Sequence, residues 1–307
     1  MIYSVIDIGT NSVKLLVAEK SPRASLRTLS HRVLITRLGE GHVPGGRLSQ
    51  NAIEKTLMAV TEFLDQARKL GSAGTAIIST AAAREAENRE DFARMVEHET
   101  GFPLRILSEE EESVLGLKGV LLAFPDFQGL VLDIGGGSFE LTYAGKEKSS
   151  SHCFPTGCVR LSEKYIHNDP PSKAERDRVN KQILIFLRSL PEAGRHEEKK
   201  LIGIGGTITT LAAILQKLDL FDEDKVHRYQ FSREALVDLD DRLWRSSVQE
   251  RLAMPGLNPG RADIIPAGSA IIRAVMEYFC IPDCTVSVWN LMHALIREMP
   301  LNDQSAS

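Results

Sequence analysis

The amino-acid sequence predicts an α/β protein built from two duplicated domains. At 307 residues the chain is longer than one typical domain. A glycine-rich segment flanked by apolar residues occurs twice, and helix-type and strand-type patterns alternate after each copy. We therefore expect a first domain over residues 1–125 and a second over residues 126–307. A final helix at about 290–299 is a candidate to pack back on the first domain.

The internal repeat is the strongest of these observations. Residues 6–18 read IDIGTNSVKLLVA, and residues 132–144 read LDIGGGSFELTYA. Asp133 follows Asp7 by 126 positions, and a glycine, a serine, a leucine and an alanine recur at the same offset. One Asp-Ile-Gly triplet would mean little. The match in register between two apolar strands indicates duplicated domains.

Each copy is typical of a strand, a tight turn and a second strand. Glycines let the turn adopt positive φ and bring its N–H groups close to a ligand. Converging N–H groups suit phosphate, and an aspartate at the strand end supplies a hard oxygen for Mg²⁺. A single such hairpin is more simply a turn, whereas the pair favours a phosphate site.

A third loop of the same kind follows in the second half. The strand Leu201–Ile204 runs into Gly205, Gly206 and Thr207 and then into a helix. A strand, a glycine turn and a helix N-terminus form the usual arrangement for holding phosphate or a nucleotide. This pattern is weak evidence alone and gains weight beside the two hairpins.

Helix signals fill the rest of the chain. Ser49 is expected to cap a helix that Gly71 closes, and Asn88 to cap one that ends at Gly101. Further helices are predicted at 109–123, 157–167, 172–189, 263–279 and from 290, with polar loops at Lys146 to Ser151 and His196 to Lys200.

Composition excludes several classes of protein. A net charge of −4 argues against a protein that coats nucleic acid or an anionic membrane. The longest apolar runs, such as Ile183 to Leu187, are far shorter than the roughly 20 residues that span a bilayer. No targeting segment is visible, and the four cysteines are most simply reduced thiols, so we expect a cytoplasmic protein.

The motifs resemble a known family. The paired DIGTNS and DIGGGS segments are similar to the phosphate loops of the actin, hexokinase and sugar-kinase superfamily. Other segments narrow this resemblance, over residues 3–290, to the short members of the exopolyphosphatase / guanosine pentaphosphate phosphatase family. They are Arg37–Gly41 (RLGEG), 79–88 (STAAAREAEN), 110–113 (EEES) ahead of 118–120 (KGV), 155–161 (PTGCVRL) and 261–263 (RAD).

The resemblance implies two ribonuclease-H-like (actin-like) domains with an active-site cleft between them. Two positions depart from the family pattern. Glu109 stands where the family usually has glycine, and Leu291-Met292-His293-Ala294 replaces Leu-Arg-x-Gly. The second departure puts substrate length or domain packing in doubt more than the chemistry.

The resemblance also implies roles for individual residues. Glu112 would be the base that activates water, with Glu111 as the near alternative, and Arg84 would clamp the phosphate under attack. Asp133 and Glu140 would hold Mg²⁺, with Asp7 as a further candidate. The remaining phosphate-binding candidates are Gly9, Thr10, Asn11, Ser12, Lys14, Gly135, Gly136, Gly137, Ser138, Gly205, Gly206 and Thr207, with Arg160 and Arg261 as possible extensions.

Simpler interpretations exist for these charges. An acidic run often just begins a helix, and an arginine often makes only a surface ion pair. The flanking motifs favour the functional interpretation.

The implied activity is Mg²⁺-dependent release of the terminal phosphate from inorganic polyphosphate, from guanosine pentaphosphate, or from both. A homodimer is implied by the resemblance alone. Two other functions stay open: a phosphotransferase of the same superfamily, whose turnover would need an acceptor, and a non-enzymatic nucleotide-responsive clamp, which would lack the water-activating carboxylate.

Overall fold

The computed structural model describes residues 1–21, 26–146, 148–190 and 199–300. The chain divides into two compact units. Unit 1 comprises residues 1–119 together with the C-terminal segment that begins at Leu291, and unit 2 comprises Val120–Asn290. The predicted boundary lay at 125/126. The interdomain cleft implied by the resemblance stays a prediction.

Unit 1 is a five-stranded sheet in the order β3-β2-β1-β4-β5, with helices on both faces. Its elements are β1 (Ile2–Ile8), β2 (Ser12–Lys20), β3 (Leu26–Ile35), α1 (Gln50–Lys69), β4 (Thr75–Ser79), α2 (Ala81–Glu85), α3 (Arg89–Thr100), β5 (Leu104–Ile106), the start of α4 (Glu109–Ala123) and α12 (Leu291–Glu298).

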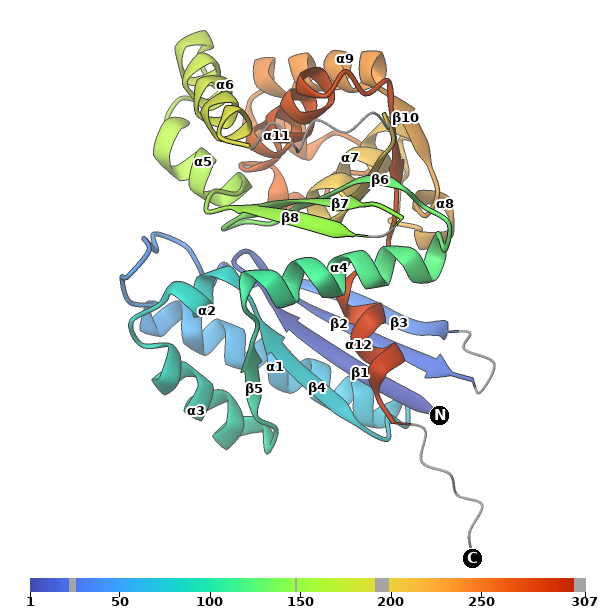
Figure 1. Ribbon diagram of the computed structural model, residues 1–307. Helices are drawn as coiled ribbons and strands as arrows, with labels where there is room; N and C mark the ends of the chain where they lie inside the picture. The colour runs from blue at the N-terminus through green and yellow to red at the C-terminus, as the bar shows by residue number, and fades with distance from the viewer. Residues whose placement is uncertain (22–25, 147, 191–198, 301–307) are drawn as a thin grey trace, which may run out of the picture. The chain divides into compact units, whose positions relative to one another are not determined.

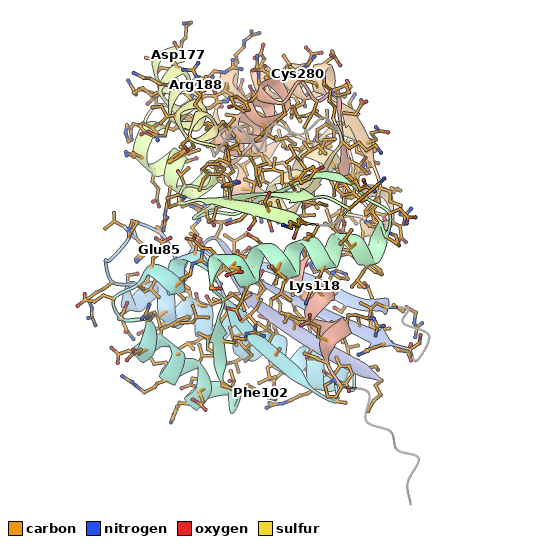
Figure 2. The ribbon with its side chains drawn as sticks, viewed as in Figure 1. Glu85, Phe102, Lys118, Asp177, Arg188 and Cys280 are labelled. Atoms are coloured by element: carbon orange, nitrogen blue, oxygen red, sulfur yellow. The ribbon has the colours of Figure 1, made fainter. Side chains whose placement is uncertain are left out.

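The alternation of side chains along β1 separates the two faces of this sheet. Ile6 and Ile8 pack with the apolar stripe of α1 and with α3, whereas Tyr3 and Val5 pack with α12. Figure 1 shows α1 and α12 on opposite faces of this sheet. The final helix is thus part of unit 1. Lys118 on α4 fastens it further, because its Nζ lies 2.6 Å from the Glu298 carboxylate (Figure 2).

Unit 2 is a six-stranded sheet in the order β10-β11-β9-β6-β7-β8. Its elements are β6 (Gly129–Ile134), β7 (Phe139–Ala144), β8 (Ser149–Phe154), α5 (Cys158–Tyr165), α6 (Lys173–Arg188), β9 (Leu201–Ile204), α7 (Gly205–Leu215), α8 (Glu223–Val226), β10 (Gln230–Ser232), α9 (Arg233–Arg245), α10 (Val248–Leu252), α11 (Ile265–Tyr278) and β11 (Asp283–Val286). Helices α5, α6, α7, α9 and α11 share one large apolar core with the sheet (Figure 1).

The duplication extends well beyond the repeated hairpin. Both units begin with three antiparallel strands, and a fourth strand then pairs in parallel beside the first. A fifth strand follows in parallel, β5 in unit 1 and β11 in unit 2. The prediction of two duplicated α/β domains is confirmed. Among the strands of the described residues, β10 has no counterpart in unit 1.

Some local predictions need correction. Asn88 occupies the predicted cap of α3, but its side chain exchanges hydrogen bonds with the backbone of Leu48 instead of capping the helix. Residues 149–151, predicted as loop, belong to strand β8. Most of the loop predicted at His196 to Lys200 lies outside the described residues. In the described part of the chain, no helix is long and apolar enough to cross a membrane.

One buried carboxylate organises the turn before α6. Glu175 is 1 % exposed, and its carboxylate accepts hydrogen bonds from the backbone N–H groups of His167, Asn168 and Ser172 and from the Ser172 hydroxyl. Burial by itself raises the pKa of this carboxyl, but these hydrogen bonds lower it to about 2.

We expect Glu175→Gln to destabilise unit 2 at pH 7, because the donors bind the ionised carboxylate. A pKa of about 2 in the folded state, against an ordinary 4.5, corresponds to at most about 3 to 4 kcal/mol of stability. This contribution is present above the unfolded-state pKa and is lost as the pH falls toward 2. Both tryptophans, Trp244 and Trp289, belong to unit 2. Urea unfolding followed by tryptophan fluorescence should therefore show a clear difference at pH 7 and a smaller one at pH 3. Equal stability at pH 7 would contradict this account.

Candidate functional site

The carbonyl groups of the first hairpin loop are held by the segment that follows β3. The Gly39 N–H donates to the Thr10 carbonyl at 2.9 Å, and the Thr36 and Arg37 N–H groups donate to the Asn11 carbonyl at 3.2 and 3.0 Å. The motif that begins at Arg37 therefore fixes the backbone of the loop.

The second hairpin loop is held in the same way by the segment that follows β8. The Cys158 N–H donates to the Gly135 carbonyl and the Val159 N–H to the Gly136 carbonyl, both at 3.0 Å. Both donors lie at the N-terminus of α5, where helix N–H groups have no partner within the helix. A Cβ on Gly157 would overlap the backbone of Gly135 and Gly136, so the approach requires glycine here.

These contacts determine where the loop N–H groups point. In a trans peptide the carbonyl and the N–H of the next residue point in opposite directions. The N–H groups of Asn11, Gly136 and Gly137 therefore point away from the segments that bind the preceding carbonyls. None of the three makes a hydrogen bond within the described part of the chain. Each loop thus presents donors suited to an anion.

A buried amide lies in the first loop. Asn11 is 5 % exposed, and neither its Oδ1 nor its Nδ2 has a hydrogen-bond partner among the described residues. Buried polar groups without partners are uncommon in folded proteins, and a site that binds a polar ligand is a common place to find them. The Asn11 side chain is therefore a further candidate to contact a bound anion.

The two hairpins differ at the position seven residues after the repeated aspartate. In the first, Lys14 lies opposite Asp7 in the strand register, and the Lys14 Nζ is 2.8 Å from Asp7 Oδ2. In the second, Glu140 lies opposite Asp133. Glu140 is 3 % exposed, and the Cys153 thiol donates to its Oε1 at 3.3 Å.

The pair Asp133 and Glu140 fits the donor set that Mg²⁺ prefers. Residues directly opposite in an antiparallel pair have side chains on the same face, and two like charges there are destabilising without a cation. Within the described ranges, no group of three or more His, Cys, Asp or Glu residues is arranged to hold a metal. Mg²⁺ commonly binds through only one or two carboxylates, with phosphate oxygens and water completing its shell.

The third loop is a further candidate anion site within unit 2. Gly205 has a φ of +86°, and a Cβ there would overlap the Asp133 carboxylate. The Arg261 guanidinium lies against Gly206, at the N-terminus of α7. Arg261 is 6 % exposed, and no carboxylate among the described residues pairs with it. Burial lowers its pKa, with the Cys158 thiol opposing that effect. A buried cation at a helix N-terminus is suited to an anionic ligand.

Cys158 connects these parts of unit 2. Its thiol donates to the Gly135 carbonyl at 3.3 Å and lies 3.8 Å from the Thr207 hydroxyl. Burial raises the pKa of the thiol. Because Cys158 also donates its backbone N–H to the loop, it ties the second hairpin to α7. Sequence patterns indicated only an ordinary thiol here, although its place directly after a glycine at a helix start was an available signal.

In unit 1 the structure brings Arg84 and Glu112 together. The Arg84 Nη1 donates to Glu112 Oε2 at 2.8 Å and to the Leu107 carbonyl at 3.0 Å. The two side chains are only 15 % and 11 % exposed. Glu109 lies 4.0 Å from Arg84 Nη2 and is half-exposed. A guanidinium that holds a partly buried carboxylate fixes its orientation, which a general base requires.

Glu111, the alternative candidate, makes different contacts from Glu112. Its N–H donates to the Ser108 hydroxyl at 3.1 Å, and its Oε2 accepts from the Ser108 N–H at 2.9 Å. Its Oε1 pairs with Arg105 at 2.6 Å. The Ser108 backbone hydrogen bond, followed by the Arg105 side chain, lowers the pKa of Glu111. This reciprocal arrangement is a capping box at the start of α4. The Ser-x-x-Glu spacing was readable in the sequence.

Arg160, a candidate extension of the binding track, is half-buried and donates to the Pro155 carbonyl at 3.2 Å. Strands β4 and β9 occupy equivalent places in the two units, each in parallel beside the first strand. In unit 2 the third glycine loop follows β9, whereas in unit 1 helix α2, which carries Arg84, follows β4. The duplicated position thus supplies a guanidinium in one unit and a glycine loop in the other.

Two duplicated α/β units, each with a glycine loop beside a strand-end aspartate, define a protein of the actin-like ATPase fold class. A sequence profile of the Ppx/GppA phosphatase family matches residues 16–302. The chain belongs to the Ppx/GppA phosphatase family.

Individual relatives match this chain over nearly its whole length. Exopolyphosphatase 2 of Mycobacterium tuberculosis is 30 % identical over 311 aligned positions, which cover 95 % of this chain and 96 % of that protein. The Aquifex aeolicus Ppx/GppA enzyme superposes with a TM-score of 0.80 at 28 % identity, covering 97 % and 99 % of the two chains. An exopolyphosphatase from Cytophaga hutchinsonii superposes with a TM-score of 0.87 at 25 % identity, and the match covers 96 % of each chain.

We expect Gly157→Ala to lower kcat/KM by about 10- to 100-fold, because the new Cβ would push the second loop's backbone out of place. Phosphate release under subsaturating substrate measures this. Gly74→Ala is the matched control, since a Cβ there meets only the Tyr3 ring at ordinary contact distance. Normal kcat/KM in the Gly157 variant would show that the loop does not need this support.

Proposed function

We propose that this phosphatase hydrolyses the terminal phosphoanhydride bond of inorganic polyphosphate, with guanosine pentaphosphate as the second substrate to compare. The pairing of Glu112 with Arg84 carries the proposal. A similarity over nearly the whole chain to a protein named exopolyphosphatase 2 supports polyphosphate as the first choice.

In the proposed reaction Glu112 orients a water molecule and takes its proton as the water oxygen attacks the terminal phosphorus. The bond from that phosphorus to the bridging oxygen breaks, and the leaving phosphate keeps the electron pair. Arg84 holds the Glu112 carboxylate in place through one nitrogen. The positive charge of Arg84 also stabilises the negative charge on the phosphoryl oxygens in the transition state.

Binding of a phosphate chain is assigned to the two hairpin loops and the third loop. Asn11, Gly136 and Gly137 offer backbone donors, and Arg261 offers a buried guanidinium. By their chemistry these groups select phosphate oxygens, whatever else the substrate carries. A chain of repeated phosphates fits that selection.

Asp133 and Glu140 are the residues that we propose to hold Mg²⁺. When bound, the ion would neutralise charge on bridging and terminal phosphate oxygens. Glu140 lies opposite Cys153 in the register of β7 and β8, and the Cys153 thiol donates to its carboxylate.

Glu112→Gln should lower kcat by about 10²- to 10⁴-fold while KM changes little, because the amide keeps the size but cannot accept the proton. Glu111→Gln is the matched control on the same helix turn. It should cost part of the α4 cap and leave kcat within a few-fold of the wild type. Steady-state kinetics on both variants decide the question. If only the Glu111 variant lost kcat, Glu111 and not Glu112 would be the base.

Substrate and metal are tested in one assay. Phosphate release from long-chain polyphosphate and from guanosine pentaphosphate is compared side by side, with Mg²⁺ and with excess chelator. We expect activity on polyphosphate that the chelator abolishes, and Asp133→Asn should be inactive yet fold normally by circular dichroism. Full activity in chelator would refute the metal assignment, and activity on guanosine pentaphosphate alone would refute the substrate assignment.

A further inference from the structure

The two hairpins have the same backbone but opposite charge at one equivalent position. Lys14 faces Asp7, and Glu140 faces Asp133, in the same register of the same strand pair. Asp133 follows Asp7 by 126 positions, and Glu140 follows Lys14 by the same number. The duplicated frame therefore holds a cation beside the aspartate in unit 1 and a second anion in unit 2.

At the first hairpin the aspartate already has a cation. The Lys14 ammonium lies 2.8 Å from Asp7 Oδ2, and the two side chains are 22 % and 5 % exposed. A divalent metal on Asp7 would have to approach this ammonium or displace it. Like charges that close repel strongly in partly buried surroundings.

At the second hairpin a second carboxylate stands where the first hairpin has the ammonium. Asp133 and Glu140 lie directly opposite each other, and Glu140 is 3 % exposed. Two carboxylates on the same face repel, and a divalent ion held by them would offset that repulsion.

We propose that Lys14 is a cation built into the chain that takes, at the first hairpin, the place that the metal takes at the second. The protein then binds a single divalent ion, and Asp7 is a positioning residue for Lys14 instead of a metal ligand. The inference rests on the proposed metal site in unit 2. Each phosphate loop would have one cation beside it: a fixed ammonium on one, an exchangeable ion on the other.

Manganese binding tests the stoichiometry without reference to activity. Titration of the full chain with Mn²⁺, followed by electron paramagnetic resonance of the free ion, should give one tight site in the wild type. Asp7→Asn should keep that site, and Asp133→Asn should lose it. Loss of the site in Asp7→Asn would overturn the proposal. Retention of the site in Asp133→Asn would instead refute the metal centre of the proposed function, whatever Lys14 does.

A gain-of-site variant sharpens this test. Lys14→Glu rebuilds in unit 1 the carboxylate pair of unit 2, so a second Mn²⁺ should bind. A stoichiometry that stays at one in a folded Lys14→Glu protein would overturn the proposal. If that variant does not fold, Lys14→Gln with Asp7 intact replaces it: removal of the competing ammonium should allow a weaker second Mn²⁺ at Asp7, and its absence counts against the proposal.

Kinetics give the second readout. Lys14→Met should raise KM for the phosphate substrate by about tenfold or more, with a smaller change in kcat, because a charged contact to the ground-state phosphate is lost. Asp7→Asn should raise KM in the same direction, and the double variant should be no worse than Lys14→Met. Lys14→Arg should recover part of the loss. Lys69→Met, at an exposed position on α1, is the matched control. An unchanged KM in Lys14→Met, or strictly additive effects of the two variants, would overturn the positioning role of Asp7.

Discussion

Backbone hydrogen bonds to the carbonyl groups of the two hairpin loops set the geometry on which the rest of each unit depends. Thr10 and Asn11 in unit 1 are bound by the chain that follows β3, and Gly135 and Gly136 in unit 2 by the start of α5. Since each bound carbonyl turns the next N–H the other way, these contacts present donors suited to an anion on the opposite side of the loop. The phosphate chemistry thus depends on residues that need not touch phosphate themselves.

The duplicated frame then carries different chemistry at equivalent positions. After the fourth strand, unit 1 places a helix with Arg84, and unit 2 places the glycines of α7 beneath Arg261. Opposite the repeated aspartate, unit 1 has Lys14 and unit 2 has Glu140. Duplication supplies two similar loops, and divergence at a few side chains assigns one to a fixed cation and the other to an exchangeable metal in our proposal.

The acidic start of α4 shows how neighbouring residues of one type take different roles. Glu111 forms a capping box with Ser108, and the Glu112 carboxylate accepts a hydrogen bond from Arg84. A helix rotates about 100° per residue, so adjacent carboxylates face different surroundings. The helix needs one of them for its own N-terminus, and the second is held by a guanidinium instead.

The sequence by itself determined the duplicated α/β fold, the three glycine loops and the family, because these depend on short motifs and on the periodicity of apolar residues. Spacing to the KGV segment favoured Glu112 over Glu111, but it could not show that Glu112 pairs with Arg84 or that Asp7 is bound by Lys14. The sequence also assigned no role to Cys158. Those facts depend on strand register, on helix phase and on segments distant in the chain, which only tertiary folding brings into contact.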